Sequence, residues 1–347
     1  MPKDIPVRRR NIVVIGGSAG SFAAVKDILD RLPHDLDAAL FFVQHMRRDR
    51  ETSLPGLLDA RGDLPVRAAS DGAKVQMGEV RTACPDRHLL LTETGMRLVH
   101  GPKENHCRPA IDPLFRSAAA QYRTRVVAVL LSGYLSDGTS GLNAVRRCGG
   151  LTMVQDPDDA QVADMPMSAL DHHEPDYVGS AARLADLIVE LSGQRAPEPA
   201  PVPADIALET RMALGKGLSM HSEAKLGALT PFACPDCGGN LWEIDDVVLR
   251  FRCHVGHAFT AEALGAVQGE KLDAALWTAL RGLRERAELL RKLEKGGGSG
   301  QHRLHGQFLS SAAELEAQAD TLMQFILSRE ISHAPEGSRH DIEDIDR

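Results

Sequence analysis

Three polar residues that together could hydrolyse an ester each follow a run of apolar residues in this chain of 347 residues. Ser18 stands within Gly-Gly-Ser-Ala-Gly at residues 16–20, the G-x-S-x-G pattern of a serine on a sharp strand-to-helix turn. His45 and Asp137 follow two further runs. In a Ser-His-Asp triad the imidazole takes the serine proton, the carboxylate orients the imidazole, and backbone N–H groups hold the oxyanion. Such a triad needs no cofactor.

Each of the three residues also has a purely structural interpretation. Ser18 could cap the helix that follows it, His45 could be an ordinary strand-end histidine, and Asp137 could be a turn or helix-cap residue. A glycine-rich turn can instead cradle a pyrophosphate, but the dinucleotide pattern G-x-G-x-x-G started at Gly16 needs glycine where Ser18 and Ser21 stand. The next apolar run also lacks a closing acidic residue. The sequence therefore disfavours nucleotide binding.

Apolar periodicity predicts the elements that must position the triad. Continuous apolar runs are typical of strands covered on both faces, and they occur at residues 11–16, 39–44, 126–131 and 151–155. Helical patterns alternate with these runs, at residues 22–32, 111–122, 138–148 and 181–191. We therefore expect an α/β domain with a mostly parallel, doubly wound sheet. Because ligands bind beyond the carboxyl ends of parallel strands, Ser18, His45 and Asp137 should meet at one sheet edge.

The segment between Val80 and His100 breaks this alternation. Short apolar pieces cover residues 80–84, 88–91 and 96–99, and Glu93-Thr94-Gly95 is a turn signal. We expect this segment to form an antiparallel excursion from the parallel sheet.

Several separated motifs carry a resemblance to a known family. They are Ile-Gly-Gly-Ser-Ala-Gly at 15–20, Val-Gln-His-Met at 43–46, His-Cys-Arg-Pro-Ala-Ile-Asp-Pro-Leu-Phe-Arg-Ser-Ala-Ala at 106–119, Leu-Ser-Gly-Tyr-Leu-Ser-Asp-Gly at 131–138, and Gln-Asp at 155–156 with Asp-Met-Pro at 164–166. In this order they resemble the catalytic domain of the chemotaxis protein-glutamate methylesterases. The resemblance covers about residues 10–192, and the order of several motifs makes it more specific than any one of them.

The resemblance implies a role for each site residue. Ser18 would be the nucleophile, His45 the general base and acid, and Asp137 its orienting carboxylate. The segment around His106 and Arg108 would line the substrate cleft. The reaction would be the hydrolysis of a glutamate γ-methyl ester on a cytoplasmic helix of a methyl-accepting receptor, with release of methanol, in bacterial signal transduction. Some relatives also deamidate glutamine. The implied partner is the receptor or a related signalling protein.

Three residues depart from the family's usual pattern. The family usually has threonine at the position of Ala19, glycine at that of Ser21 and methionine at that of Tyr134. Ala19 and Tyr134 correspond to positions that border the oxyanion hole, whose backbone N–H donors survive a change of side chain. The chain also begins directly at the catalytic strand. It therefore resembles the stand-alone form of the enzyme, in which something other than a receiver domain must regulate activity.

A second cluster of residues has the spacing of a metal site. Cys234-Pro-Asp-Cys237-Gly-Gly is followed by two strand-like stretches and then by Cys253-His254-Val-Gly-His257. Two cysteine-containing knuckles joined by a hairpin are typical of a zinc ribbon, and we predict Cys234, Cys237, Cys253 and His257 as tetrahedral ligands. His254 is the competing fourth ligand, although it directly follows Cys253. Four protein ligands favour a structural zinc. A redox dithiol and plain buried cysteines are the alternatives.

The remaining segments give the predicted domain organisation. The catalytic α/β domain covers residues 10–193, a proline-rich linker with a short polar helix covers 194–226, and the zinc-ribbon-like module covers 227–260. Residues 261–330 show two helical repeats around Lys-Gly-Gly-Gly-Ser-Gly at 295–300, which predicts an antiparallel helical hairpin. The hairpin could pack on itself, form a homo-oligomer or dock on a receptor or partner. The polar tail 331–347 is predicted to be disordered.

Composition narrows the class of protein. A formal net charge of −8 without long charged runs argues against a nucleic-acid binder. The sequence has no signal-peptide segment and no apolar stretch long enough for a membrane span, which favours a cytoplasmic protein without membrane insertion. The leading hypothesis is a protein-glutamate methylesterase. The rival is a non-catalytic signalling module of the same fold, in which only binding remains.

Overall fold

The structure, a computed structural model, describes residues 8–46, 54–59, 63–215, 227–244, 247–296 and 302–333. The chain divides into two compact units, which meet in sequence between Gly265 and Ala266. The predicted remainder of the linker at 216–225, the glycine-rich break at 297–300 and the tail after residue 333 lie outside the described residues.

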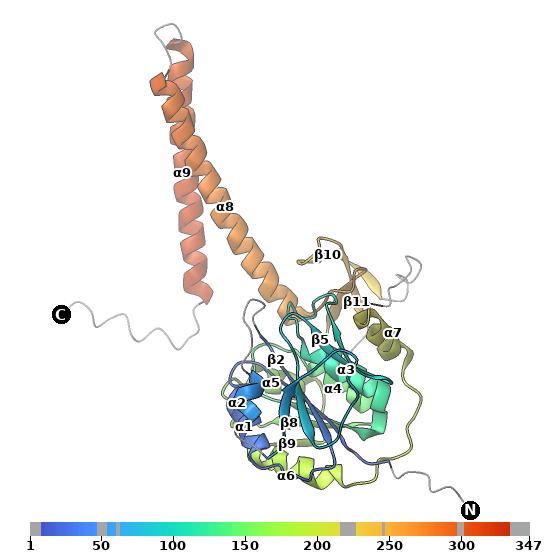
Figure 1. Cartoon of the computed structure of the whole chain (residues 1–347). Helices are drawn as coiled ribbons and strands as arrows, with labels where there is room; N and C mark the ends of the chain where they lie inside the picture. The colour runs from blue at the N-terminus through green and yellow to red at the C-terminus, as the bar shows by residue number, and fades with distance from the viewer. Residues whose placement is uncertain are drawn as a thin grey trace, which may run out of the picture. The chain divides into compact units, whose positions relative to one another are not determined.

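A seven-stranded sheet forms the centre of the first unit (Figure 1). In spatial order its strands are β3 (Val66–Ala68), β4 (Glu79–Thr82), β2 (Ala39–Gln44), β1 (Ile12–Gly17), β7 (Val126–Leu130), β8 (Leu151–Gln155) and β9 (Tyr177–Gly179). Every neighbouring pair is parallel. After β1, the next strands β2 to β4 lie on one side of it, and β7, β8 and β9 lie on its other side. This places the switch point of the sheet beside β1, where ligands of such sheets bind.

The antiparallel excursion is smaller than the sequence predicts. Only β5 (His88–Thr92) and β6 (Gly95–Val99) form an antiparallel hairpin. The first predicted piece, residues 80–84, overlaps β4, which pairs in parallel with β2 and places Val80 opposite Leu40. The prediction was wrong for this piece because a strand this short carries no signal of its direction. The backbone N–H of Gly78 binds the carbonyl of Ala38 and sets the parallel register.

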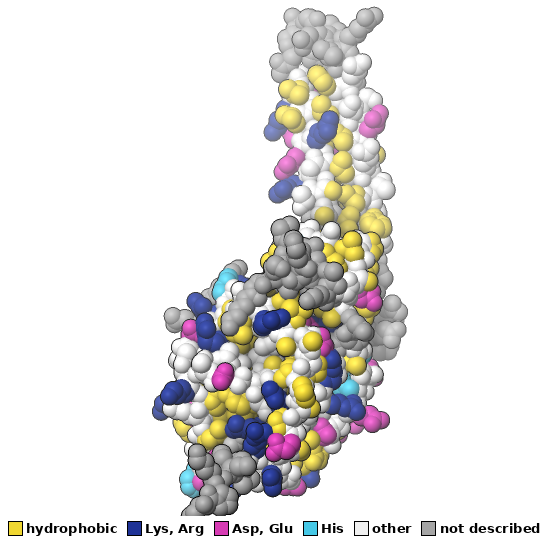
Figure 2. Space-filling model, turned by 90° about the vertical axis from the view of Figure 1, so that its right-hand side faces the viewer, with side chains coloured by type: hydrophobic (Ala, Val, Ile, Leu, Met, Phe, Trp, Pro, Cys, Tyr) yellow, Lys and Arg dark blue, Asp and Glu magenta, His cyan; other side chains and the backbone are white. Residues whose placement is uncertain are grey.

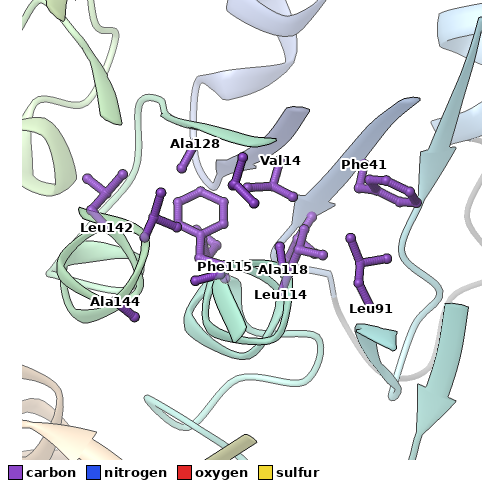
Figure 3. Close-up of a cluster of buried hydrophobic side chains, with 14 of the residues drawn as sticks. Val14, Phe41, Leu91, Leu114, Phe115, Ala118, Ala128, Leu142 and Ala144 are labelled. Atoms are coloured by element: carbon purple, nitrogen blue, oxygen red, sulfur yellow. The ribbon is translucent and has the colours of Figure 1, made fainter. Parts of the chain in front are cut away.

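Helices cover both faces of the sheet. One face packs against α1 (Ser21–Leu29), α2 (Leu54–Asp59) and α6 (Ala181–Ser192), and the other against α3 (Ile111–Tyr122), α4 (Thr139–Arg147) and α5 (Asp164–His172). Alternate residues of β1 point to the two faces of the sheet. Val13 belongs to the hydrophobic cluster on one face and Val14 to the cluster on the other. Figure 3 shows Val14 of β1 beside Phe115 of α3, and Phe41 of β2 nearer to Leu91. Burial on both faces explains the continuous apolar runs in the sequence.

A small antiparallel sheet completes the first unit. It consists of β10 (Ala228–Ala233), β11 (Asn240–Ile244), β12 (Arg250–Cys253) and β13 (Ala258–Thr260). We call it the metal-binding sheet, after the metal ligands that the sequence predicts for it. Helix α7 (Ala204–Ala213) precedes it. Residues of the loop before α3 continue the sheet beyond β13, because Glu104 bridges Ala258 and the N–H of Asn105 donates to the carbonyl of Ala258 at 2.8 Å.

A buried ion cluster joins the metal-binding sheet to the large sheet's helices. Its members come from the loop before α3, from α3, from α7 and from β12, and they are Glu104, Arg116, Glu209, Arg250 and Arg252. Arg252 of β12 lies 3.2 Å from Glu104 and 2.6 Å from Glu209. Burial disfavours the charge of Glu104, but the guanidinium groups of Arg116 and Arg252 prevail and lower its pKa to about 2.

Two long helices make up the second unit. Helix α8 (Ala261–Gly296) enters it from the first unit, and α9 (His302–His333) follows. They run antiparallel, since Asp273 pairs with Arg329 and Arg291 pairs with Glu316. Leu280, Ala319 and Ile326 are buried between them. Other hydrophobic side chains remain at the surface of the pair, and Figure 2 shows a row of them along it. No helix in the described ranges has the length and apolarity of a membrane span.

Candidate active site and metal centre

The three predicted triad residues meet at the carboxyl ends of three adjacent strands. Ser18 follows β1, His45 follows β2, and Asp137 lies in the loop after β7. The Nδ1 atom of His45 is 3.1 Å from the hydroxyl oxygen of Ser18. The Nε2 atom is 2.7 Å from Oδ2 of Asp137. The structure thus brings together, in one hydrogen-bonded chain, residues that are 27 and 92 positions apart.

The partners of His45 determine which ring nitrogen carries the proton. An ionised carboxylate only accepts hydrogen bonds, so Nε2–H donates to Asp137. In the neutral imidazole, Nδ1 is then unprotonated and accepts the hydroxyl proton of Ser18. In the template serine-protease triad the two nitrogens have the opposite partners. The direction of proton transfer is the same in both arrangements, because the serine still faces the basic nitrogen.

A tight turn holds Ser18 at the start of α1. Gly20 has a φ of 76°, in the left-handed region that glycine adopts without strain. The backbone N–H and the hydroxyl of Ser21 both donate to the carbonyl of Ser18, the latter at 2.7 Å. Opposite them, Gly133 approaches so closely that a β-carbon there would lie 2.7 Å from Cβ of Ser18. The turn therefore leaves the Ser18 hydroxyl free to face His45.

Asp137 is held by donors on both carboxylate oxygens. Its Oδ2 accepts the N–H of Ile111 at 2.7 Å, and its Oδ1 accepts the side-chain amide of Asn105 at 2.9 Å and the N–H of Asp112 at 3.3 Å. Ile111 is the first residue of α3, whose N-terminus favours a negative charge. Burial raises the pKa of Asp137, but hydrogen bonds, above all that from His45, overcome this and lower the pKa to about 2. The residue is ionised at neutral pH.

The surroundings make His45 a stronger base than a free imidazole. Its side chain is only 18% exposed, and burial lowers its pKa. The interactions with Cys107 and with the Asp137 carboxylate outweigh burial and raise the pKa well above the usual value. Cys107 thus lies close to the imidazole.

A second carboxylate lies beneath Asp137. Asp112 is 1% exposed, and its Oδ1 accepts the N–H groups of Gly138 and Gly141 at 3.1 and 2.6 Å. Burial and the negative charge of Asp137 raise the pKa of Asp112 to about 7. The side-chain amide of Asn105 lies between the two carboxylates and donates to both.

The other predicted site residues lie around this chain of hydrogen bonds. Ala19 follows Ser18 directly, and Tyr134 is 61% exposed in the loop that carries Asp137. The guanidinium of Arg108 is bound to Asp86 and to the carbonyl of Gly101 and is largely buried. His106 pairs with Asp236 of the metal-binding sheet at 3.0 Å. Both side chains are therefore used within the structure itself.

Sequence reasoning missed three polar residues of the site: Asn105, Cys107 and Asp112. All three lie in or beside the motif at 106–119 that carries the family resemblance. Their proximity to the triad depends on how the loop before α3 folds across the end of β7. The many polar residues directly before the buried helix α3 were the sequence signal from which these residues could have been predicted.

Four residues of the metal-binding sheet form a cluster that could hold a metal ion. The ligand atoms of Cys234, Cys237, Cys253 and His257 all lie within 4.8 Å of one another. The Sγ atoms of Cys237 and Cys253 are 3.7 Å apart, and Nδ1 of His257 is 3.7 and 3.6 Å from the Sγ atoms of Cys234 and Cys253. Tetrahedral bonds of about 2.3 Å to sulfur and 2.0 Å to nitrogen give edges of roughly 3.5–3.8 Å. The spacing therefore fits such an ion.

Two glycine turns shape the cluster. The N–H of Gly238, at φ 74°, donates to the carbonyl of Cys234, and the N–H of Gly256, at φ 110°, donates to that of Cys253. His254, the competing ligand, lies outside the cluster, where its ring meets Trp242 edge-on with centroids 6.4 Å apart.

Comparison with known proteins places this geometry in a family. A profile of the CheB methylesterase family matches residues 13–188. A Leptospira interrogans relative named protein-glutamate methylesterase/protein-glutamine glutaminase is 34% identical over 180 residues, which are 52% of this chain and 93% of that protein. Protein-glutamate methylesterase/protein-glutamine glutaminase 2 of Burkholderia pseudomallei is 36% identical over 181 residues, 52% of this chain and 53% of that protein.

A solved structure shares the fold. The Thermotoga maritima CheB methylesterase catalytic domain is 34% identical and matches with a TM-score of 0.51, over 52% of this chain and 98% of that one. The family profile ends at residue 188, before α7 and the metal-binding sheet.

Proposed function

The chain belongs to the CheB methylesterase family, and from that premise we propose that it is a serine hydrolase that removes methyl groups from glutamate γ-methyl esters of methyl-accepting receptor proteins. Deamidation of glutamine at the same site is the companion activity, since the relatives' names include both. The observation that carries the proposal is the hydrogen-bonded chain from Ser18 through His45 to Asp137.

The proposed reaction follows from this chain. Nδ1 of His45 takes the hydroxyl proton while the oxygen of Ser18 attacks the ester carbonyl. The Asp137 carboxylate stabilises the imidazolium that forms. Collapse of the tetrahedral intermediate transfers the proton from His45 to the leaving group. The leaving group departs as methanol from a methyl ester, or as ammonia from the side-chain amide of a glutamine. Water then attacks the acyl-enzyme by the same base catalysis and restores Ser18 with a free glutamate.

We assign the oxyanion donors to backbone N–H groups beside Ser18. The structure shows no acceptor for the N–H of Ala19 among its described residues, and this group directly follows the nucleophile. Tyr134 lies in the loop after β7 and directly follows Gly133, which approaches Ser18 closely. Backbone donors do not depend on the side chains that depart from the family pattern, so the departures at Ala19 and Tyr134 are compatible with turnover.

The rival hypothesis is a binding module that has lost catalysis. Such a module has no need of an ionised, buried carboxylate whose donors come from α3 and from Asn105. The pKa of Asp137 is lowered, so its carboxylate is ionised and can stabilise the imidazolium that a working triad forms. These observations favour the enzyme.

We further propose that the cysteine cluster holds a structural zinc ion. Three thiol sulfurs and one imidazole match the ligand preference of zinc, and four protein ligands leave no position open for a substrate. The ion would contribute folding energy to a sheet whose own apolar cluster holds only a few buried residues. Catalysis takes place at the triad and uses no cofactor.

The proposed partner is the methylated helical segment of a receptor or of a related signalling protein. Because this substrate faces the cytoplasm, we place the protein there. The helical pair α8 and α9 could add a docking surface or an oligomer contact to this recognition.

The experiment that tests the proposed function is methanol release from a methylated receptor fragment by the full chain. We expect Ser18→Ala to remove turnover, by about 10³-fold or more, because the nucleophile is lost. Ser310→Ala is the matched control, since Ser310 is exposed on α9, and it should hydrolyse the ester at the normal rate. Methanol release that survives in Ser18→Ala would contradict the assignment of the nucleophile, and absence of release by the unaltered chain would favour the binding module.

A further inference from the structure

We propose that the metal-binding sheet positions the catalytic carboxylate Asp137, and that Asn105 is the positioning residue that joins the two. The inference rests on the proposed function, because it assigns Asp137 to catalysis. It adds a role for the C-terminal part of the first unit, which lies beyond the residues matched by the family profile.

The side chain of Asn105 is bound at both ends. Its amide nitrogen donates to Oδ1 of Asp137 at 2.9 Å and to Oδ2 of Asp112 at 3.2 Å. Its amide oxygen accepts the backbone N–H of Thr260, the last residue of β13, at 2.9 Å. A single side chain thus connects a triad residue to a strand of the metal-binding sheet, and it is 9% exposed.

The backbone around Asn105 is also held by this sheet. The N–H of Asn105 donates to the carbonyl of Ala258 at 2.8 Å, and the N–H of Ala258 donates to the carbonyl of Lys103 at 3.2 Å. Asn105 and His106 have φ values of 51° and 61°, which side-chain-bearing residues rarely adopt. Such a conformation persists only where neighbours impose it. Asn105 is held by its contacts with β13 and with Asp112 and Asp137, and His106 is held by its pair with Asp236.

The metal ligands lie at the turn that sets the position of β13. Cys253 ends β12 and His257 directly precedes β13, and the N–H of Cys253 donates to the carbonyl of His257 at 3.0 Å. Arg252, next to Cys253, is anchored in the buried ion cluster by Glu104, the neighbour of Asn105. An ion held by Cys253 and His257 would therefore fix the turn from which Ala258 and Thr260 reach Asn105.

Loss of Asn105 would leave Oδ1 of Asp137 with one hydrogen bond, the 3.3 Å bond from Asp112. The carboxylate could then turn away from Nε2 of His45. Among the hydrogen bonds of the described residues, Asn105 reaches one triad atom, Oδ1 of Asp137, while Oδ2 is the oxygen that binds His45. The expected effect is on the chemical step and not on substrate binding.

The first experiment compares Asn105→Ala with Asn11→Ala in the full chain. Asn11 is an equally buried asparagine that binds Arg125 at the start of β1, far from the triad in the sheet. We expect Asn105→Ala to lower kcat about 10- to 100-fold with KM unchanged, which corresponds to the loss of one hydrogen bond to a charged group. Asn11→Ala should keep kcat. A purely structural role predicts similar kcat values for the two variants once they are compared at equal folded fractions.

The second experiment removes the metal. Full chain loaded with zinc is compared with chelator-treated chain and with Cys237→Ser, and Cys84→Ser controls for the loss of a thiol outside the cluster. We expect metal loss to lower kcat toward that of Asn105→Ala, and to add little further loss in the Asn105→Ala background, because both act through one contact. Unchanged kcat in the metal-free chain, or fully additive losses, would overturn the proposal.

A spectroscopic readout separates this proposal from the proposed function. The proton between Nε2 of His45 and Asp137 gives an NMR resonance that does not require turnover. We expect this resonance in the zinc-loaded chain, its loss or upfield shift in the metal-free chain and in Asn105→Ala, and no change in Asn11→Ala. If the chain releases no methanol, the methylesterase is wrong, and the resonance still decides whether the sheet positions Asp137.

Discussion

The triad and the metal centre of this protein are built in opposite ways. The triad gathers residues from three strand ends across more than a hundred positions, and the buried faces of a parallel sheet hold them. The metal centre gathers its ligands from positions 234–257, within one small sheet that has a minor apolar cluster. Apolar packing fixes the strand ends that carry the first site, and the side chain of Asp137 is held in addition by Asn105. The second site has the right ligands at the right spacing and would depend on the proposed ion for rigidity.

The substitution that tests the triad most strongly in this comparison is Asp137→Asn. The amide keeps the shape of the side chain but removes the charge that stabilises the imidazolium and selects the tautomer, so we expect kcat/KM to fall about 10³- to 10⁴-fold. His45 acts as a base in its neutral form, so the rate of the unaltered chain should rise with pH through its raised pKa. Without the negative charge that pKa falls, and the rising limb moves to lower pH.

The measurement is the pH profile of kcat/KM for both proteins. Asp176→Asn is a matched control, because Asp176 binds Thr152 near β9 and does not contact the triad. A rising limb that stays in place in Asp137→Asn would contradict the role given to this carboxylate.

The corresponding test on the side of the metal centre is Cys253→Ser. We expect bound zinc to fall from about one ion per chain to none, since a hydroxyl is a poor zinc ligand. Amide protons of β10–β13 should then exchange faster by at least about tenfold, because this sheet would lose its ion while the parallel sheet keeps its buried core. Hydrogen exchange read strand by strand, with zinc analysis, checks both parts. Equal acceleration in β1, β2 and β7 would show that the two sheets do not differ in this way.

A further test concerns the join between the two regions. Glu104→Gln removes one charge from the buried ion cluster and leaves Arg116 and Arg252 poorly compensated, which should lower the free energy of unfolding by about 3–5 kcal/mol near neutral pH. Glu198→Gln breaks an exposed pair with Arg8 and should cause no measurable change.

This cost should depend on pH in a defined direction. The pKa of Glu104 is lowered from 4.5 to about 2 in the folded chain. Its ionised form therefore stabilises the fold fully above pH 4.5, and that contribution is lost as the pH falls from about 4.5 to 2. Denaturant unfolding of both proteins should show the difference shrinking over this range. A constant difference would mean that the charge of Glu104 is not what stabilises the join.

Sequence reasoning succeeded where a pattern repeats or a rule ties chemistry to strand ends. The four long buried strands and the family motifs led to the parallel sheet and to a meeting of Ser18, His45 and Asp137 at its edge, and the structure has this geometry. The spacing of cysteines led to the cluster that could bind a metal. Fold class and family are confirmed by the comparisons, while the catalytic roles and the zinc ion stay proposals.

What sequence reasoning missed depends on contacts between distant segments. Strands β3 and β9 have three residues each and carry no periodicity, and β4 was given the wrong direction. The ring nitrogen that faces Ser18 follows from the path of the chain after β2, not from residue type. The contact between Asn105 and Thr260 spans 155 positions, and neither residue belongs to a recognisable motif for it.

The position of Thr260 has a consequence for the folding of the protein during its synthesis. A ribosome releases the N-terminus first, so the nascent polypeptide exposes Ser18 and His45 early, Asp137 much later, and Thr260 only when nearly the whole first unit has emerged. Pairing β1 with β7 must itself wait for a long loop to close. The proposed triad therefore cannot form before Asp137 has emerged, and the contact from Thr260 to Asn105 is among the last that the first unit can make.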